Sequence, residues 1–345
     1  KTKEGELTQG SDYRFHPYGA SAVTAIAAAK SEGECVFATR FGDDTNGKRL
    51  YEYYKSCGIL TRAMKKDSMA QTGMSVTLFS DLDAHESYLS AGASARFTKE
   101  EIDDAFITMP DMFLVPLEEL GVETHTVLMK QPEAAAASAS AADKKAEGGE
   151  ASDGTDKVIS SETVSSYREE ESLALYALKK AQERHVDLLL QYTPFTAKFP
   201  LETLENIKIL VISDEMLYSL TGFFPNTTDK ALRSLVALSQ KIKAKYYIVQ
   251  QGDDTAFIYD GQYYETVQAP VPLRTNTKDA GKKMQQTFIG ALAAEYLESK
   301  NILRACHFAI AVSLLTRAKF GNLEKMMSRA ELDAYAEEHG VSLYQ

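Results

Sequence analysis

The segment FATRFGDDTNGKRLYEYYKSCGI, residues 37–59, decides the fold. Its start lies inside a short apolar run, residues 35–42, that ends in glycine and is typical of a β-strand. An amphipathic pattern follows over residues 45–58 and predicts a helix with Gly58 as its C-cap. The segment therefore predicts a strand that is followed at once by a helix.

The same alternation continues on both sides of this segment. An alanine-rich stretch before it, residues 19–33, predicts a helix. The later elements are a helix at 171–185, strands at 186–194 and 207–214, a helix at 230–244, a strand at 245–252 and a hairpin at 255–267 with Asp260-Gly261 at its turn. Such alternation predicts an α/β fold, a doubly wound and mainly parallel sheet with helices on both faces.

Three segments depart from this rhythm. Residues 10–18 and 72–92 alternate as antiparallel strands do, so we expect them to form a small extra sheet. Residues 132–157 are dominated by Ala, Ser, Gly and charged residues and contain no aromatic residue. Such a segment has almost nothing to bury, so it predicts a solvated insertion, either a plain surface loop or a frayed helix. We expect one domain over residues 1–345.

Composition excludes several classes of function. The formal net charge is −11, and a chain without a basic block is a poor binder of nucleic acids or anionic membranes. No apolar run approaches the roughly 20 residues that span a bilayer, and the first residues are polar, unlike a signal peptide. The three cysteines and six histidines are scattered, which indicates a reducing, cytoplasmic setting and no zinc site.

The order of these features resembles the PfkB/ribokinase family of carbohydrate kinases. The stretch YGASAVTAIAAAKSEG, residues 18–33, is similar to the family's Gly-Gly-led helix, and residues 72–98 are similar to its lid strands. The segment at 37–59 matches the first family signature through Arg40, Gly42, Asp43, Asp44 and Gly47. Later stretches, residues 209–222, 246–270 and 288–297, follow in the family's order.

The resemblance implies a ribokinase-like fold and an activity. A large doubly wound domain would carry a β-lid, here about residues 5–18 and 70–95, and the lid often forms a homodimer contact. The implied activity is ATP-dependent phosphate transfer to a hydroxyl of a sugar or nucleoside. Family members normally start with a strand that contributes an Asp to the sugar, whereas the first residues here already resemble the lid.

The resemblance also assigns a catalytic base, and this chain has no carboxylate at that position. The family base is an Asp two positions before the Phe of an F-x-G-A-L stretch; that Phe is Phe288, so Gln286 holds the base position. An amide has no useful basicity near pH 7. The preceding Gly-Ala-Gly positions, whose backbone N–H groups form an anion hole, are Lys283, Met284 and Gln285. Their long side chains hinder close approach of the backbone to a phosphate.

Other family positions have changed as well. The Mg²⁺-linked Asn-x-x-Glu stretch has Ser213 and Met216 at its ends, and Met offers no oxygen ligand. Asp214 and Glu215 lie between them, where we expect them to act as helix N-terminal charges. The family's Asp-x-Asn-x-Arg stretch, which ends a central strand, has Gln191, Thr193 and Phe195 at its polar positions. The nucleotide-side stretch keeps Gly252 but has Thr255 in place of its second glycine. On the sugar side, the Gly-Gly pair is Tyr18-Gly19 and the Asn is Val23.

These losses favour a kinase-like scaffold whose chemistry is impaired and which acts by binding or assembly. No cofactor and no metal is then expected. The alternative is an active sugar or nucleoside kinase with a divergent site, which would use ATP and Mg²⁺. In that case Asp279, in the turn TKDAGKK, would replace the lost base. Lys282 and Lys283 would in either case be available to an anionic ligand.

Overall fold

The computed structural model describes residues 16, 19–79, 85–115, 126–130, 173–193, 196–251, 254–270, 283–318 and 326–344. Strand β1 (Glu34–Gly42) runs directly into helix α2 (Thr45–Ser56), as the opening segment predicts. Gly58, just beyond α2, has φ +89°, a left-handed conformation that glycine adopts without strain. Helix α1 (Ala20–Lys30) precedes β1, so the predicted helix–strand–helix order is confirmed here.

The central sheet has nine strands in the order β11-β10-β9-β8-β7-β5-β6-β1-β2. The remaining bounds are β2 Met64–Asp67, β5 Met112–Val115, β6 Thr126–Lys130, β7 Asp187–Tyr192, β8 Ile207–Ser213, β9 Tyr246–Gln251, β10 Thr255–Tyr259 and β11 Tyr264–Gln268. Strands β5, β7, β8 and β9 are parallel, as are β1 and β2. β6 is antiparallel to both neighbours, and β10 and β11 are antiparallel as well. The α/β class is thus confirmed, but the sheet is more mixed than alternation alone predicts.

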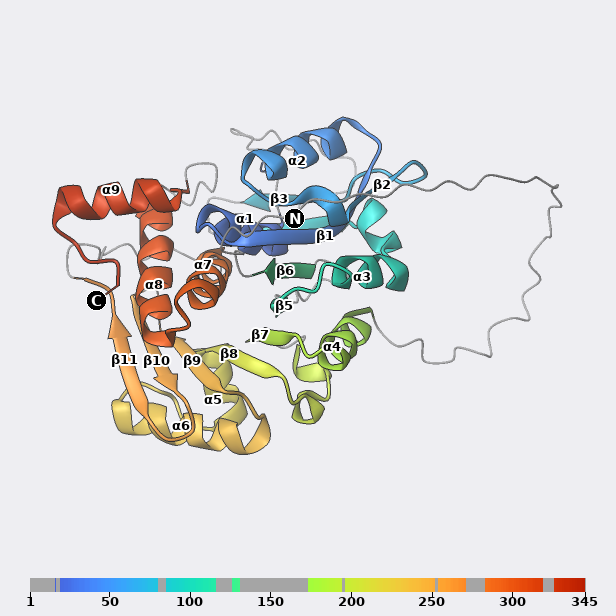
Figure 1. The fold of residues 1–345 in the computed structure, drawn as a ribbon. Helices are drawn as coiled ribbons and strands as arrows, with labels where there is room; N and C mark the ends of the chain where they lie inside the picture. The colour runs from blue at the N-terminus through green and yellow to red at the C-terminus, as the bar shows by residue number, and fades with distance from the viewer. Residues whose placement is uncertain are drawn as a thin grey trace, which may run out of the picture.

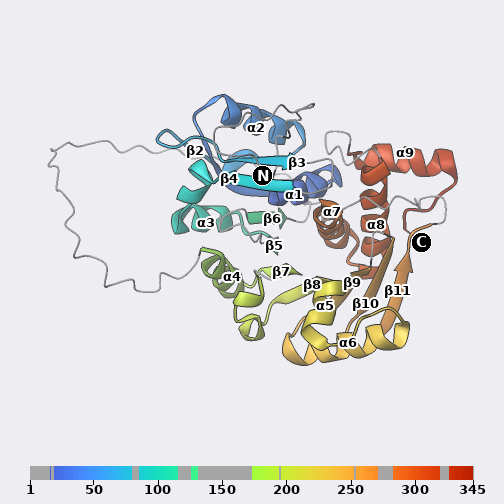
Figure 2. The ribbon, with the colours of Figure 1, turned by 180° about the vertical axis from the view of Figure 1, so that it is seen from behind.

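Helices cover both faces of this sheet (Figures 1 and 2). One face carries α1, α7 (Lys283–Ser299) and α8 (Ile302–Ala318), with α2 and α9 (Arg329–His339) on the same buried cluster. The other face carries α3 (Lys99–Phe106), α4 (Leu173–Glu183), α5 (Asp214–Thr221) and α6 (Thr228–Lys241). Short 3₁₀ turns complete the described elements: η1 Thr61–Ala63, η2 Gly92–Arg96, η3 Thr196–Lys198 and η4 Leu201–Thr203.

The strands between these layers are apolar on both faces. In β8, Ile209 and Val211 belong to the cluster under α7, whereas Leu210 and Ile212 belong to the cluster on the opposite face. All four side chains are fully buried. Strands that are covered on both faces have continuous rather than alternating apolar runs, which is why residues 207–212 read so clearly as a strand.

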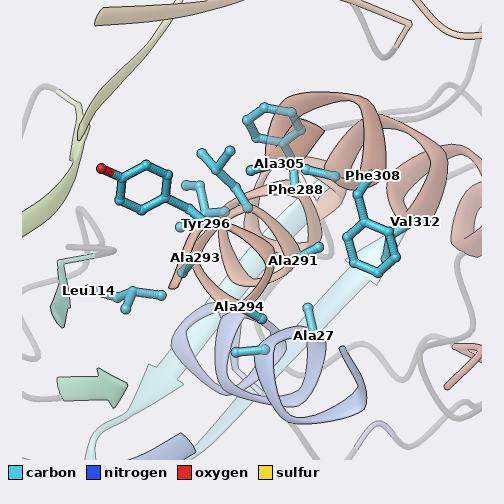
Figure 3. Packing of buried hydrophobic residues seen from close by; sticks show 14 of the residues in the cluster. Ala27, Leu114, Phe288, Ala291, Ala293, Ala294, Tyr296, Ala305, Phe308 and Val312 are labelled. Atoms are coloured by element: carbon cyan, nitrogen blue, oxygen red, sulfur yellow. The ribbon is translucent and has the colours of Figure 1, made fainter. Parts of the chain in front are cut away.

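Helices α1 and α7 pack unusually closely. Figure 3 shows the small side chains Ala27 of α1 and Ala294 of α7 between the two helices. Gly290 lies at the closest point, because a Cβ atom there would be 2.2 Å from the carbonyl oxygen of Thr24. Phe288 and the other apolar side chains of α7 are buried against the sheet and α8. The helix is therefore a central part of the core.

A separate two-stranded sheet lies within the segment assigned to the lid. Strands β3 (Met74–Phe79) and β4 (His85–Ser90) are antiparallel, with Val76 opposite Tyr88. Met74, Val76, Leu78 and Tyr88 are between 43% and 59% exposed. Apart from His16, the lid strand expected at residues 5–18 and the insertion at residues 132–157 lie outside the described residues. None of the described helices has the length and hydropathy that crossing a membrane requires.

Candidate functional site

Polar side chains gather at the carboxyl ends of the parallel strands β7, β8 and β9. Gln191, Ser213 and Gln250 alternate with the buried residues that face the opposite helix layer, so all three lie on the α7 side of the sheet. Ser213 is the direct strand partner of Gln250. The carboxyl edge of a parallel sheet is where open α/β folds bind their ligands. The first turn of α7 lies over this edge.

Three glutamine side chains form a chain of hydrogen bonds at this edge. The Nε2 of Gln191 donates to the Oε1 of Gln285 over 2.7 Å, and the Nε2 of Gln286 donates to the Oε1 of Gln191 over 3.5 Å. Gln191 is only 5% exposed. The positions assigned to the strand end, the anion hole and the base are therefore brought together. All three carry neutral amides, which donate and accept hydrogen bonds but do not titrate.

Two further polar groups nearby are buried without a partner among the described residues. The Oε1 of Gln250 and the Oγ1 of Thr287 accept no hydrogen bond there, although their residues are 6% and 0% exposed. An unsatisfied buried acceptor costs about 1–3 kcal/mol. The sequence analysis did not single out Gln250. The one feature that could have indicated it is its polar side chain near the end of an otherwise apolar strand, residues 245–252. Its free oxygen suits a ligand hydroxyl or amide donor.

The positions assigned to a metal serve the start of α5. The hydroxyl of Ser213 accepts a hydrogen bond from the backbone N–H of Met216, and Asp214 accepts one from the N–H of Glu215. The Met216 side chain packs against the core on the far face of the sheet. Asp214 and Glu215 thus lie in the first turn of a helix, where carboxylates are favourable. Within the described ranges, no three His, Cys, Asp or Glu side chains cluster so that they could hold a metal ion.

The sugar-side positions lie near the same end of α7. Near their starts, Gly290 of α7 contacts Thr24 of α1. Further along, Arg329 binds both Ser31, the residue after α1, and Glu295 of α7. The two helices therefore run in the same direction. Gly19 is the exposed N-cap of α1, while Val23 is 4% exposed and packs in the core. Thr255 begins β10, opposite Gln251 at the carboxyl end of β9.

Several assigned residues lie outside the described part of the chain. These are Tyr18, Phe195, Gly252, Asp279 and Lys282. Lys283 and Met284 are the first residues of α7, and only their backbone is described. The substitute base Asp279 and the anion-binding role of the lysine pair therefore stay predictions.

The family signature forms a network that holds the base of the small sheet. The carboxylate of Asp44 caps α2 through the N–H of Gly47 and binds both the N–H and the hydroxyl of Thr72. Burial alone would raise the pKa of Asp44, but these hydrogen bonds together lower it. Gly47 must be small, because a Cβ atom there would lie 2.1 Å from the carbonyl oxygen of Gly42.

Asp67 is the second anchor of this network, and the sequence patterns did not single it out. Its carboxylate is buried and accepts hydrogen bonds from the N–H groups of Met69 and Ala70. The Nε atoms of Arg96 and Arg40 lie 2.8 Å and 3.1 Å from it. The Met69 N–H and the two guanidinium groups lower the pKa of Asp67. The only sequence signal was a polar turn after a short strand, which does not reveal the partners.

Comparison with known proteins agrees with this architecture. Residues 1–148 match the family described as pfkB family carbohydrate kinase. A ribokinase from Haemophilus influenzae is 28% identical over 134 residues, which are 38% of this chain and 44% of that protein. The match thus spans less than half the length of this curated relative.

Solved ribokinase structures are similar over nearly the whole chain. Ribokinase from Arabidopsis thaliana, complexed with ribose and ATP, has a TM-score of 0.67 at 16% identity and covers 96% of this chain and 90% of its own. Ribokinase from Thermotoga maritima has a TM-score of 0.65 at 19% identity, and the match covers 97% of this chain and 93% of that one. A putative ribokinase II from E. coli in complex with ATP and Mg²⁺ has a TM-score of 0.67 at 14% identity, and the match covers 98% of this chain and 95% of that one. At these identities the likeness establishes the fold.

Proposed function

We propose, from the premise that this is a PfkB/ribokinase-family carbohydrate kinase-like protein, that it is impaired in phosphoryl transfer and acts by binding or assembly. The fold and the family resemblance are the established part of this statement. The loss of catalysis and the mode of action are our inference from the residues at the carboxyl edge of the sheet.

The hydrogen-bonded amides of Gln191, Gln285 and Gln286 carry the proposal. Phosphoryl transfer requires a group that takes the proton of the attacking hydroxyl, and donors that stabilise the moving phosphate. Gln286 at the base position is hydrogen-bonded to Gln191, which in turn donates to Gln285. None of these side chains can remove a proton near neutral pH. Gln191, the buried member, donates to one neighbour and accepts from the other, so its burial does not depend on a bound nucleotide.

The metal positions support the same conclusion. Mg²⁺ in kinases is held by oxygen ligands and bridges the phosphates of ATP. The hydroxyl of Ser213 already caps a helix, and Met216 packs into the opposite core. Asp214 and Glu215 remain as the nearest carboxylates on α5, and Asp214 binds a backbone N–H of its own helix. A Mg²⁺–ATP complex would therefore lack the ligands that organise it.

A sugar or nucleoside is the ligand class that we propose for this edge. Ribose is bound in the Arabidopsis ribokinase structure, which has the same fold. Hydroxyl groups both donate and accept hydrogen bonds, and they match neutral amides better than phosphates do. The unpartnered Oε1 of Gln250 would accept one such hydroxyl. Binding of this kind requires no cofactor.

Assembly through the small sheet is the second part of the proposal. Met74, Val76, Leu78 and Tyr88 lie on one face of β3–β4 and are exposed. A contiguous exposed apolar face of this kind commonly marks an interface. The family resemblance favours a second copy of this chain as the partner. A two-fold homodimer would place the same face on itself.

Thermal denaturation with ATP and Mg²⁺ tests the nucleotide part directly. A ligand present at 100 times its dissociation constant adds about 2.7 kcal/mol to the free energy of unfolding, which raises Tm by several degrees. We expect millimolar ATP–Mg²⁺ to leave Tm within about one degree of the value without nucleotide. The control repeats the measurement with ATP and a chelator. A rise of several degrees that depends on Mg²⁺ would overturn the proposal.

A further inference from the structure

A hollow of about 560 Å³ lies at the opposite edge of the sheet from the amide cluster. Its wall includes Asp111, Asp187, Lys208 and Lys245, which lie within one residue of the starts of β5, β7, β8 and β9. A strand of six residues separates the two edges by roughly 15–20 Å. The hollow is therefore distinct from the site at the carboxyl edge. Its size falls within the range of small-molecule sites.

The wall of this hollow is positively charged, although the chain as a whole carries −11. Four cations, Arg184, Lys208, Lys245 and Lys300, face two carboxylates, Asp111 and Asp187. Lys208 pairs with Asp187 at 2.8 Å. Within the described residues, Lys245 and Lys300 form no ion pair, and the Lys245 ammonium lies 5.0 Å from the Tyr246 ring. These two ammonium groups are available to a ligand.

The backbone of the wall adds an independent observation. Met109, His185 and Lys300 all have positive φ, of 47°, 55° and 54°, and all three line the hollow. His185 is the second residue after α4 and Lys300 the first after α7, at helix ends where glycine is the unstrained residue. A non-glycine residue in this conformation costs on the order of 1 kcal/mol. The chain nevertheless places a histidine and a lysine at these two lining positions, at an energetic cost.

A simpler explanation accounts for only part of this charge. Helix C-termini carry partial negative charge and attract cations within the last turn. That effect explains Arg184 and Lys300, which follow α4 and α7. It does not explain Lys208, which lies inside β8, or Lys245, which precedes β9 and lies four residues beyond the end of α6. These two lysines provide the excess charge.

The remainder of the wall is apolar and suits the carbon part of a ligand. Five apolar residues line the hollow, and all are buried: Phe106, Pro110, Val186, Tyr296 and Leu297. An adjoining hollow of about 310 Å³ shares Asp187, Lys208 and Lys245 and adds Lys243 and Glu205. We infer that this edge binds a small organic phosphate, with its phosphate on Lys208, Lys245 and Lys300 and its carbon part on the apolar wall.

Calorimetric titration with pyrophosphate and with phenyl phosphate tests the inference. We expect saturable binding of both probes at low salt, weakening as salt is raised because charge supplies the attraction. The variant Lys245→Ala/Lys300→Ala should bind each probe at least tenfold more weakly. The control Lys48→Ala/Lys55→Ala removes the same charge from exposed positions on α2 and should change affinity less than twofold.

The single variant Lys300→Gly separates ligand binding from folding. Glycine relieves the positive φ of residue 300, so Tm should stay level or rise while the affinity for pyrophosphate falls several-fold. The inference is overturned if the native chain shows no saturable binding, if the double variant binds as the native chain does, or if the α2 control weakens binding equally. A Tm shift with ATP that disappears in Lys245→Ala/Lys300→Ala belongs to this hollow and not to the carboxyl edge.

Discussion

Gln286 stands where the family resemblance assigns a catalytic base, and its side chain is a neutral amide. Its amide has a donor and an acceptor, so it can orient a hydroxyl but cannot take its proton. Gln191 links it to Gln285 in a neutral, hydrogen-bonded chain. At this scale, our proposal is that a few side-chain replacements are enough to separate the fold from phosphoryl transfer.

Asp44 shows the opposite case, a family residue whose observed contacts are structural. Its carboxylate accepts hydrogen bonds from Thr72 and Gly47, which more than offset the effect of burial and lower its pKa. The folded state therefore favours the carboxylate. Its contribution to the free energy of unfolding is complete above the ordinary Asp pKa of about 3.9 and falls as pH drops through the lower folded-state pKa.

The variant Thr72→Val tests this linkage. It removes the hydroxyl that donates to Asp44 and should lower the free energy of unfolding by about 1–2 kcal/mol at pH 7. Because protonation of Asp44 weakens the same bond, the difference from the native chain should shrink below about pH 4. Urea unfolding at pH 7 and pH 3.5 measures it. In the control Thr203→Val, the lost hydroxyl donates to a backbone carbonyl, which does not titrate. The difference in free energy of unfolding between this variant and the native chain should therefore not change with pH. A pH-independent loss for Thr72→Val would contradict the role of Asp44.

Among the elements, α7 is a helix whose first turn carries no acidic residue and whose packing accounts for its place in the fold. Phe288, Ile289 and Leu292 are fully buried, and Gly290 allows the closest approach to α1. Further along, the buried Glu295 pairs with Arg304 and Arg329, so α7 also holds α8 and α9. The packing of the helix is thus independent of the chemistry at its start.

Substitution of Gly290 tests this role of α7. A Cβ atom at residue 290 meets the Thr24 carbonyl oxygen at 2.2 Å, and neither backbone can move without separating the helices. We expect Gly290→Ala to lower the free energy of unfolding by about 1–3 kcal/mol or more, seen as a lower urea midpoint at an unchanged slope. Gly19→Ala is the matched control, since a Cβ atom there has no neighbour within 4 Å. An unchanged midpoint for Gly290→Ala would refute the close-packing account.

The sequence predicts elements better than it predicts their partners. Alternation of apolar and polar stretches located β1, α2, β8 and β9, because each is a run with one clear period. It did not reveal that β6 runs antiparallel between β5 and β1, since strand direction depends on the connection rather than on the strand itself. The family resemblance placed Gln191 and Gln286 in one site, and the structure brings them together across 95 positions of sequence.

The remaining site features could not be predicted because they depend on long-range contacts. Asp67 meets Arg40 and Arg96 from distant segments. The basic hollow combines residues from the ends of three helices and the starts of four strands, and no local pattern groups them. Only the assembled sheet places them at one edge.

At the scale of the whole molecule, the exposed face of β3–β4 predicts a homodimer. We expect the native chain at micromolar concentration to have twice the monomer mass of 38.1 kDa by light scattering. Val76→Glu would place a carboxylate in the centre of the exposed apolar face and should yield the monomer. The control Ser75→Glu adds the same charge to the other face of β3 and should leave the dimer intact. A native monomer would contradict the proposal.

Sugar-dependent release of ADP from ATP–Mg²⁺ is the measurement that tests the loss of catalysis most directly. We expect the native chain to release no more ADP with a panel of sugars and nucleosides than without them. Gln286→Asp alone should not restore turnover, because base, anion hole and metal ligands act as a unit and their effects are not additive. The variant to compare with it combines Gln286→Asp with Lys283→Gly, Gln285→Gly and Met216→Glu. If the native chain turns over a sugar and Asp279→Asn abolishes that activity, then Asp279 is the base and the protein is an active kinase.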